Sequence, residues 1–91
     1  MTLDELYQKI EDRKKNMPKD SYVASLFKDG GDRIIQKVGE EATEVVIAAK
    51  NEKRERIISE VADLWFHIFV LLSKFGIKPA EVLEELEKRK K

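Results

Sequence analysis

The sequence contains no cysteine, so it can form no disulfide bond and offers no thiolate to a metal ion or to catalysis. This composition suits the reducing cytoplasm, which is where we expect the protein to work. Glycine and proline are also scarce, with four and two residues, and no stretch alternates polar and apolar residues as a half-buried strand does. The chain is therefore suited to helices rather than to sheets or long loops.

The charges leave no excess of either sign. Eighteen lysine and arginine residues balance eighteen aspartate and glutamate residues, so no overall field attracts nucleic acid or an anionic membrane surface. The longest apolar stretch, VADLWFHIFVLL, is too short and too interrupted to cross a bilayer, and the acidic, amphipathic start is unlike a secretion signal. We expect neither a nucleic-acid partner nor a membrane, and any electrostatic function must be local.

Apolar residues recur at helical spacing from end to end, which predicts an all-α fold of about five helices. The first helix is expected over residues 3–15, behind a capping box formed by Thr2 and Glu5. A second, short helix should follow a cap at Ser21 or Asp20. It should end in the segment KDGG, where a glycine can adopt a left-handed conformation.

Two longer helices follow in the sequence. The third is predicted from Asp32, which would cap it, to about residue 50, and the fourth over about residues 53–75. Their short connection makes them antiparallel neighbours. Gly39 lies in the middle of the third helix, where glycine is about 1 kcal/mol less favourable than alanine, so another backbone or a ligand is expected to come close. A fifth helix should begin at Pro79.

A chain of this length forms one domain, residues 1–91, and buries only about 60 to 65% of the surface that its unfolded form exposes. The predicted fourth helix is apolar almost all the way round, which is typical of a helix that is central or shared between subunits. We therefore expect a homodimer in which copies of this helix shield each other. Three aromatic side chains are expected in the core or at this seam rather than at a base-stacking surface: Trp65, Phe66 and Phe69. Leu72 is also expected at the seam.

Four carboxylates stand out on the third and fourth predicted helices. Glu41 and Glu44 are three residues apart, as are Glu60 and Asp63, so each pair lies on one side of its helix. Antiparallel packing brings the pairs together, and burying them is costly unless they are paired or bind a metal ion. An all-oxygen ligand set suits hard cations, Mg²⁺ above all, with Mn²⁺ as a substitute. His67 is expected to be a hydrogen-bonded residue rather than a ligand.

Two alternatives to a magnesium site concern the same residues. A di-iron site would use Glu-x-x-His on two helices, and neither pair has histidine at the fourth position. Salt bridges to Lys37 or Lys50 would also compensate the glutamates, in which case the cluster would only stabilise the fold. The spacing alone leaves a metal site and a structural cluster of ion pairs open.

The segments around these carboxylates resemble a known family. SYVASLFKDGGDRIIQKVGEEATEVVIAAKN, followed by ISEVADLWFHIFVLL, is similar to phosphoribosyl-ATP pyrophosphohydrolase of histidine biosynthesis, one of the all-α nucleotide pyrophosphohydrolases related to MazG. The resemblance covers nearly the whole chain. The family motif, Glu-x-x-Glu followed by Glu-x-x-Asp, falls on Glu41, Glu44, Glu60 and Asp63. It implies Mg²⁺-dependent hydrolysis of phosphoribosyl-ATP to phosphoribosyl-AMP and pyrophosphate.

The resemblance also suggests roles for residues near the motif. Glu40, beside the cluster, is a candidate for the base that takes a proton from the attacking water, and so is Glu44. Lys37, Arg33 and Lys28 are candidates for binding the phosphates. Some relatives are fused to the cyclohydrolase of the following step. This chain has neither the length nor the zinc-binding cysteines for that, so we expect it to perform its step alone.

Two other functions stay open at this point. One is a house-cleaning enzyme of the same fold that hydrolyses a different nucleoside triphosphate. The other is a non-enzymatic helical assembly module whose glutamates form only salt bridges. Assays of phosphoribosyl-ATP against ordinary triphosphates, with and without Mg²⁺, would separate all three.

Overall fold

The computed structural model describes residues 1–90, and within that range it contains five helices and no strand. The helices are α1 (Leu3–Asn16), α2 (Tyr22–Asp29), α3 (Gly31–Lys50), α4 (Arg54–Lys74) and α5 (Pro79–Lys88). The all-α prediction is confirmed, and the helix boundaries lie close to the expected ones. No helix in the described range is long and apolar enough to cross a bilayer.

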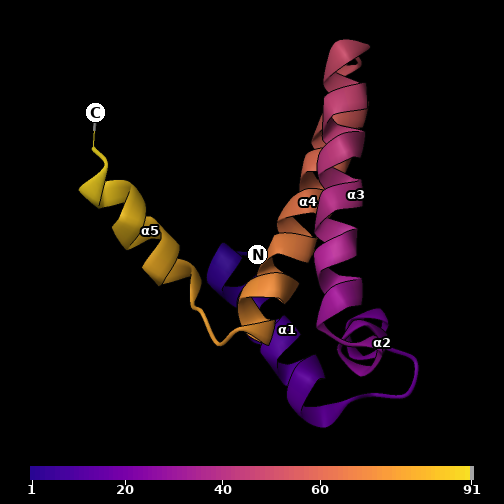
Figure 1. The fold of residues 1–91 in the computed structure, drawn as a ribbon, viewed down its shortest axis with the longest axis vertical. Helices are drawn as coiled ribbons and strands as arrows, with labels where there is room; N and C mark the ends of the chain where they lie inside the picture. Colours follow the sequence, from indigo (N-terminus) through magenta and orange to yellow (C-terminus); the bar gives the residue numbers. More distant parts are fainter. Residues whose placement is uncertain (91) are drawn as a thin grey trace.

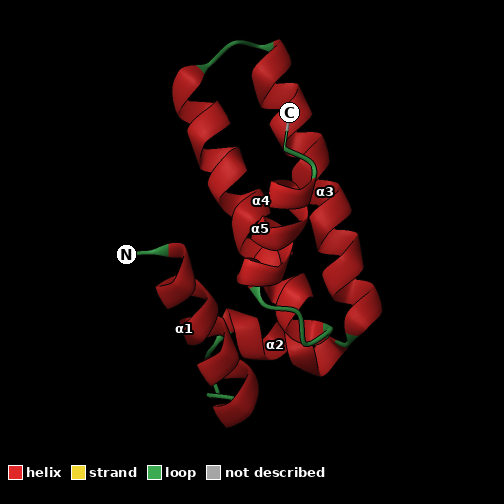
Figure 2. Ribbon diagram, turned by 90° about the vertical axis from the view of Figure 1, so that its left-hand side faces the viewer, coloured by secondary structure: helices red, strands yellow, loops and turns green. Residues whose placement is uncertain are grey.

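α3 and α4 form a long antiparallel hairpin (Figure 1). α1 and α2 lie at the end of this hairpin where α3 begins and α4 ends, away from the connection between the two long helices (Figure 2). α5 points away from the hairpin and buries no residue. The fold is therefore a helical hairpin with α1 and α2 packed against one end, which we call the foot of the hairpin. The rest of the chain leaves α5 largely uncovered.

The starts of α1 and α2 follow the predicted cap chemistry. The Thr2 hydroxyl accepts a hydrogen bond from the Glu5 amide at 3.1 Å, and the Glu5 carboxylate accepts one from the Thr2 amide at 3.0 Å. The Ser21 hydroxyl accepts a hydrogen bond from the Ala24 amide at 3.1 Å. These bonds satisfy amides that have no partner inside their own helix, which fixes where each helix begins.

One expectation about α3 is wrong, and one of the two alternatives for Gly39 is not met. Asp32 does not cap the helix, because α3 begins at Gly31 and only Gly30 separates it from α2. Gly30 has a φ of 101°, which reverses the chain within one residue and leaves Asp32 in the first turn, where its charge suits the positive end of the helix dipole. No backbone from residues 1–90 approaches Gly39, since a methyl group there would meet no atom within 4 Å.

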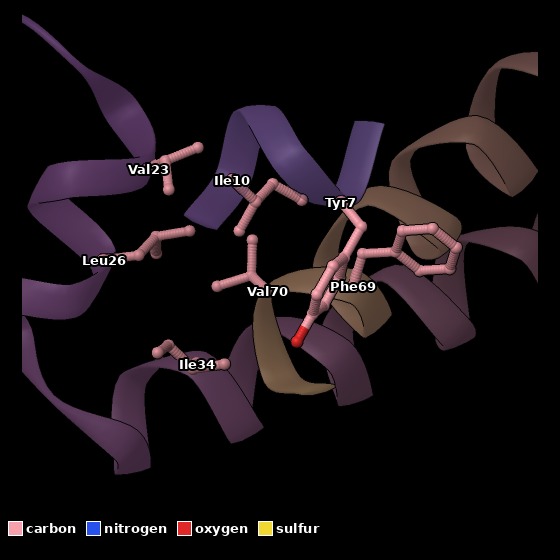
Figure 3. Packing of buried hydrophobic residues seen from close by; sticks show 7 residues of the cluster. All are labelled: Tyr7, Ile10, Val23, Leu26, Ile34, Phe69 and Val70. Atoms are coloured by element: carbon pink, nitrogen blue, oxygen red, sulfur yellow. The ribbon is translucent and has the colours of Figure 1, made fainter. Parts of the chain in front are cut away.

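The hydrophobic core lies at the foot of the hairpin, where α1 and α2 meet α3 and α4 (Figure 3). Tyr7 and Phe69 pack edge to face with ring centroids 6.3 Å apart. The Tyr7 hydroxyl donates a hydrogen bond to the Ile77 carbonyl at 2.8 Å, which ties α1 to the segment before α5. The buried apolar cluster consists of Tyr7, Ile10, Val23, Leu26, Ile34, Phe69 and Val70.

A buried polar contact fastens α1 to the end of α4. The hydroxyl of the fully buried Ser73 donates a hydrogen bond to Glu11, and the Lys14 ammonium donates one to the Ser73 carbonyl at 2.8 Å. Lys14 also pairs with Glu11 at 3.3 Å. Each polar group at this junction therefore has a partner, as burial requires.

The side chains expected at a dimer seam divide between the core and the surface. Phe69 is buried against Tyr7 within one chain, which leaves it little surface for a partner subunit, and Phe66 and Leu72 are half-buried. Trp65 is 50% exposed. α1 buries more of the apolar surface at the end of α4 than the composition of α4 led us to expect.

Candidate active site

Three of the four predicted carboxylates come together between α3 and α4. Glu41, Glu60 and Asp63 each offer one oxygen, and these three oxygens lie within 4.8 Å of one another. The Glu41 and Glu60 side chains are only 14% and 12% exposed, whereas Asp63 is exposed. We call these three residues the carboxylate group. Its members come from facing turns of the antiparallel hairpin, as the spacing of the two motifs predicted.

Glu44 is not part of this carboxylate group. It is exposed, and none of its oxygens lies within the 4.8 Å that joins the other three. Glu44 lies about 60° from Glu41 around α3, the same angle that separates Glu60 from Asp63 around α4, so the spacing of the pair does not by itself explain the difference. In this conformation the fourth ligand of the predicted set stays on the solvent side of α3.

Lys37 is the cation closest to the carboxylates of α3. Its ammonium lies 3.3 Å from Glu41 and 3.4 Å from Glu40. Burial alone would lower the pKa of Lys37, but hydrogen bonds to Glu41 and Glu40 and the nearby Tyr22 phenol outweigh it, so the pKa is raised. Lys37 is therefore charged throughout the physiological range.

Glu40 lies on the outer side of the Lys37–Glu41 ion pair. Two side chains, Gln36 and Lys37, donate hydrogen bonds to it. The Gln36 amide donates a hydrogen bond to it at 2.9 Å, and this bond, followed by the Lys37 ammonium, lowers the pKa of Glu40. A carboxylate whose pKa is lowered is a weaker base. This geometry makes Glu40 a poorer candidate than Glu44 for removing a proton from water.

On α4, Arg56 pairs with Glu60 at 3.5 Å, and Asp63 has no ion pair within the part of the chain that the structure describes. Lys37 and Arg56 thus compensate only part of the charge of the carboxylate group. Lys50, the other cation considered for this purpose, forms no ion pair among residues 1–90. The remaining negative charge is what a divalent cation would balance.

The donor set also fits a hard cation. It consists of carboxylate oxygens alone, which Mg²⁺ and Mn²⁺ prefer over nitrogen or sulfur. Mg²⁺ holds its oxygens at about 2.0 to 2.1 Å, so two oxygens on one ion are at most about 4.2 Å apart. Small side-chain rotations would bring the three oxygens from within 4.8 Å to that spacing. Three ligands leave coordination positions for water or for phosphate oxygens.

The predicted phosphate-binding cations are placed unequally. Arg33 precedes Lys37 by one helical turn and lies close enough to Glu40 to lower its pKa. Lys28 is exposed near the end of α2 and makes no hydrogen bond or ion pair in the described residues. Lys37 is therefore paired with the carboxylate group, Arg33 lies one turn of α3 before Lys37, and no contact connects Lys28 to the group.

His67 is buried beside the carboxylate group and uses both ring nitrogens. Its Nδ1 lies 2.7 Å from the Asp63 carbonyl oxygen, and because a carbonyl only accepts, Nδ1 carries the hydrogen. Its Nε2 lies 2.9 Å from the Tyr22 hydroxyl and, in the neutral ring, accepts from it. His67 is thus the hydrogen-bonded residue that its position predicted.

Tyr22 is the residue that the sequence did not point to. It is the first residue of α2, and its contact with His67 spans 45 residues of sequence. Nothing in the spacing of a short helix shows that its first turn crosses α4 at this point. The only signal was an aromatic residue directly after the helix cap.

Comparison with known proteins identifies the family. Residues 3–90 match the family model described as phosphoribosyl-ATP pyrophosphohydrolase. A protein named phosphoribosyl-ATP pyrophosphatase from Methylibium petroleiphilum is 56% identical over 97% of this chain and 73% of its own length. Its namesakes from Geobacter sulfurreducens and Sulfurisphaera tokodaii are 55% and 53% identical, over 96% and 98% of this chain and 81% and 95% of their own lengths. The resemblance noted in the sequence is confirmed, and the chain belongs to the phosphoribosyl-ATP pyrophosphohydrolase family.

Proposed function

We propose that this protein hydrolyses phosphoribosyl-ATP to phosphoribosyl-AMP and pyrophosphate, the second step of histidine biosynthesis. The observation that carries the proposal is the carboxylate group, in which Glu41, Glu60 and Asp63 converge beside Lys37. The family match over residues 3–90 supports the choice of substrate, because the same carboxylates would suit any triphosphate.

Glu41, Glu60 and Asp63 would hold Mg²⁺, or Mn²⁺ in its place. The bound ion would offset phosphate charge and make a coordinated water more acidic. Glu41 and Glu60 are mostly buried, so their oxygens have few positions to choose from, whereas the exposed Asp63 adjusts more easily. Glu44 completes the ligand set of the family motif only if its side chain turns inward.

Glu44 is the better candidate for the base that accepts a proton from the attacking water. It makes no hydrogen bond or ion pair in residues 1–90, so its oxygens are available, whereas Glu40 is held by Gln36 and Lys37. A base must come within hydrogen-bonding distance of the water it activates. Glu44 follows Glu41 by less than one turn of α3 and can reach that position by rotation about its side-chain bonds.

Lys37, with Arg33 behind it, would bind the phosphates. Lys37 already lies 3.3 Å from Glu41, so a phosphate bound at the carboxylate group would be within reach of its ammonium. This contact would offset charge on the departing pyrophosphate in the transition state. Lys28 has no such position and is the weakest of the three candidates.

The proposed working form is a cytoplasmic homodimer. Exposed apolar side chains remain on both helices of the hairpin, and surfaces of this kind are typical of interfaces between subunits. Ile58 and Trp65 lie seven residues apart on one side of α4, and Ile35 and Val46 lie eleven apart on one side of α3. The absence of cysteine agrees with a reducing compartment.

The direct test compares products from phosphoribosyl-ATP, dUTP, dCTP and ATP, each with Mg²⁺ and with a chelator. We expect pyrophosphate and phosphoribosyl-AMP from the first substrate, slow turnover of the others, and none with chelator. Equal turnover of an ordinary triphosphate would favour a house-cleaning enzyme. Inactivity toward all four with Mg²⁺ present would favour a helical assembly module.

A further inference from the structure

The ring of Tyr22 is exposed and yet held firmly. The residue is 48% exposed at the first position of α2, where it follows the capping residue Ser21. Tyrosine is intermediate between core and surface residues in how often it is buried, so its exposure alone does not indicate a function. Its three contacts with neighbouring residues show that it is not a loosely attached side chain.

These contacts come from Phe66 and His67 on α4. The Tyr22 ring stacks on Phe66, with centroids 6.1 Å apart and an angle of 23° between the rings. It meets His67 edge to face at 5.8 Å, and its hydroxyl lies 2.9 Å from the His67 Nε2. We call Tyr22, Phe66 and His67 the aromatic group. Phe66 covers one side of the Tyr22 ring, so the accessible part lies away from Phe66.

A chain of hydrogen bonds through His67 connects the aromatic group to the carboxylate group. His67 donates a hydrogen bond to the backbone carbonyl of Asp63 at 2.7 Å. The Tyr22 hydroxyl lies 2.9 Å from the Nε2 of the same His67, so Tyr22 is two hydrogen bonds away from the backbone of Asp63. The exposed ring therefore lies next to the region where the phosphates would bind, on the side where α2 crosses the hairpin.

We propose that the exposed ring of Tyr22 is the stacking surface for the purine base of the nucleotide substrate. This inference rests on the proposed function, because it takes the phosphates to be bound at the carboxylate group. Every base has an aromatic face, so stacking contributes affinity without selecting the base by hydrogen bonds. A ring already fixed by Phe66 and His67 loses little freedom when a ligand binds.

The other exposed aromatic rings do not have this position. Trp65 is two residues from Asp63 and is thus turned about 200° away from it around α4. Phe75 is 58% exposed at the end of α4 and makes no ring contact with another aromatic residue in the described range. Phe75 therefore serves as a matched control, since replacing it also removes an exposed ring.

The test measures KM and kcat for phosphoribosyl-ATP in Tyr22→Leu, Tyr22→Phe and Phe75→Leu, together with inhibition by tripolyphosphate, which has no base. We expect Tyr22→Leu to raise KM by about 10- to 100-fold and to leave inhibition by tripolyphosphate unchanged. Tyr22→Phe keeps the ring and loses only the hydrogen bond to His67, so its KM should rise by less than about tenfold. Phe75→Leu should match the wild type.

A wild-type KM in Tyr22→Leu would overturn the proposal. So would an equal loss of tripolyphosphate binding, because the ring would then shape the phosphate site and not bind the base. A second measurement needs no substitution: nuclear Overhauser contacts between Tyr22 ring protons and adenine protons of α,β-methylene-ATP bound with Mg²⁺. We expect these contacts, and a bound nucleotide that shows none would contradict the proposal. Because this probe is not a substrate, the result stands even if phosphoribosyl-ATP is not hydrolysed.

Discussion

Asp63 joins the two parts of the site. Its carboxylate belongs to the carboxylate group, and its backbone carbonyl accepts the hydrogen bond from His67. Glu41, across the hairpin, is held by Lys37 at 3.3 Å. The three carboxylates thus lie close together with less positive charge nearby than they carry, which raises the free energy of the protein without a metal ion.

Mg²⁺ should therefore raise the unfolding temperature of the wild type. A ligand present at ten times its dissociation constant stabilises the folded protein by about 1.4 kcal/mol. For a domain of this size, that free energy raises the unfolding temperature by about 6 to 11 °C. Combining Glu41→Gln with Asp63→Asn should abolish this rise. Calorimetry with Mg²⁺ and with chelator measures the unfolding temperatures of the wild type and of the double variant.

A matched control is the double variant with Glu84→Gln and Glu87→Gln, which removes two exposed carboxylates of α5 far from the hairpin. This variant should keep the wild-type response to Mg²⁺. The double variant of Glu41 and Asp63 loses mutual repulsion and should be no less stable than the wild type in chelator. Equal shifts in all three proteins would place the metal elsewhere.

Lys37 is the side chain for which the largest kinetic effect is expected. Replacing it by Met should lower kcat/KM by about 10- to 150-fold, since hydrogen bonds to charged groups are worth about 1.5 to 3 kcal/mol. The control is Lys50→Met, on the same helix and without an ion pair in residues 1–90, which should retain wild-type kinetics. Similar losses in both variants would indicate a general effect of charge rather than a contact from Lys37.

At the scale of the helices, the junction of α1 and α4 depends on ionised Glu11. The hydrogen bond from Ser73 holds the pKa of Glu11 below its ordinary value of 4.5; burial opposes this shift, and Lys14 adds to it. A carboxyl whose folded pKa is lowered contributes stability above its unfolded pKa and loses that contribution as pH falls through the folded pKa. The wild type should therefore lose stability as the pH falls below about 4.5.

Ser73→Ala removes the main cause of this shift and should reduce the loss of stability in acid. The free energy of unfolding by urea, measured between pH 6 and pH 3, gives the comparison. Glu5, whose pKa is also lowered, is unchanged in both proteins, so its contribution cancels in the difference. Parallel pH curves for the wild type and Ser73→Ala would show that this hydrogen bond does not couple folding to the ionisation of Glu11.

The helices were largely predictable because their ends depend on local chemistry. Thr2 and Ser21 cap their helices as expected, and the two Glu-x-x-Glu/Asp spacings placed carboxylates on facing sides of a hairpin. Asp32 was assigned wrongly because a single glycine, Gly30, ends one helix and begins the next. A spacing rule could not have excluded this, since it depends on how tightly two helices join.

The rest of the site depends on how the helices rotate and cross, which spacing does not determine. Glu44 shares a motif with Glu41 but is exposed outside the carboxylate group, whereas the equally spaced Glu60 and Asp63 both belong to it. Tyr22 reaches His67 only because α2 crosses the foot of α4. Phe69 was expected in the core or at an interface, and it is buried by Tyr7, which comes from a helix more than fifty residues away in the sequence.

For the whole molecule, the apolar side chains left exposed predict a dimer. Sedimentation at micromolar concentration should give twice the chain mass of 10.6 kDa, and the unfolding temperature should rise with protein concentration. Trp65→Glu places a charge on the hairpin and should shift the protein toward monomer. A well-folded, active monomer in the wild type would contradict this prediction.

Hydrolysis by this protein should depend on a divalent cation held by the carboxylate group between α3 and α4. Anomalous diffraction from crystals grown with Mn²⁺ locates the ion directly. We predict a peak in contact with oxygens of Glu41, Glu60 and Asp63, and no peak there after Glu41→Gln plus Asp63→Asn. A Mn²⁺ peak held by other residues, or a wild-type crystal of active protein with Mn²⁺ and no peak between these helices, would contradict this assignment.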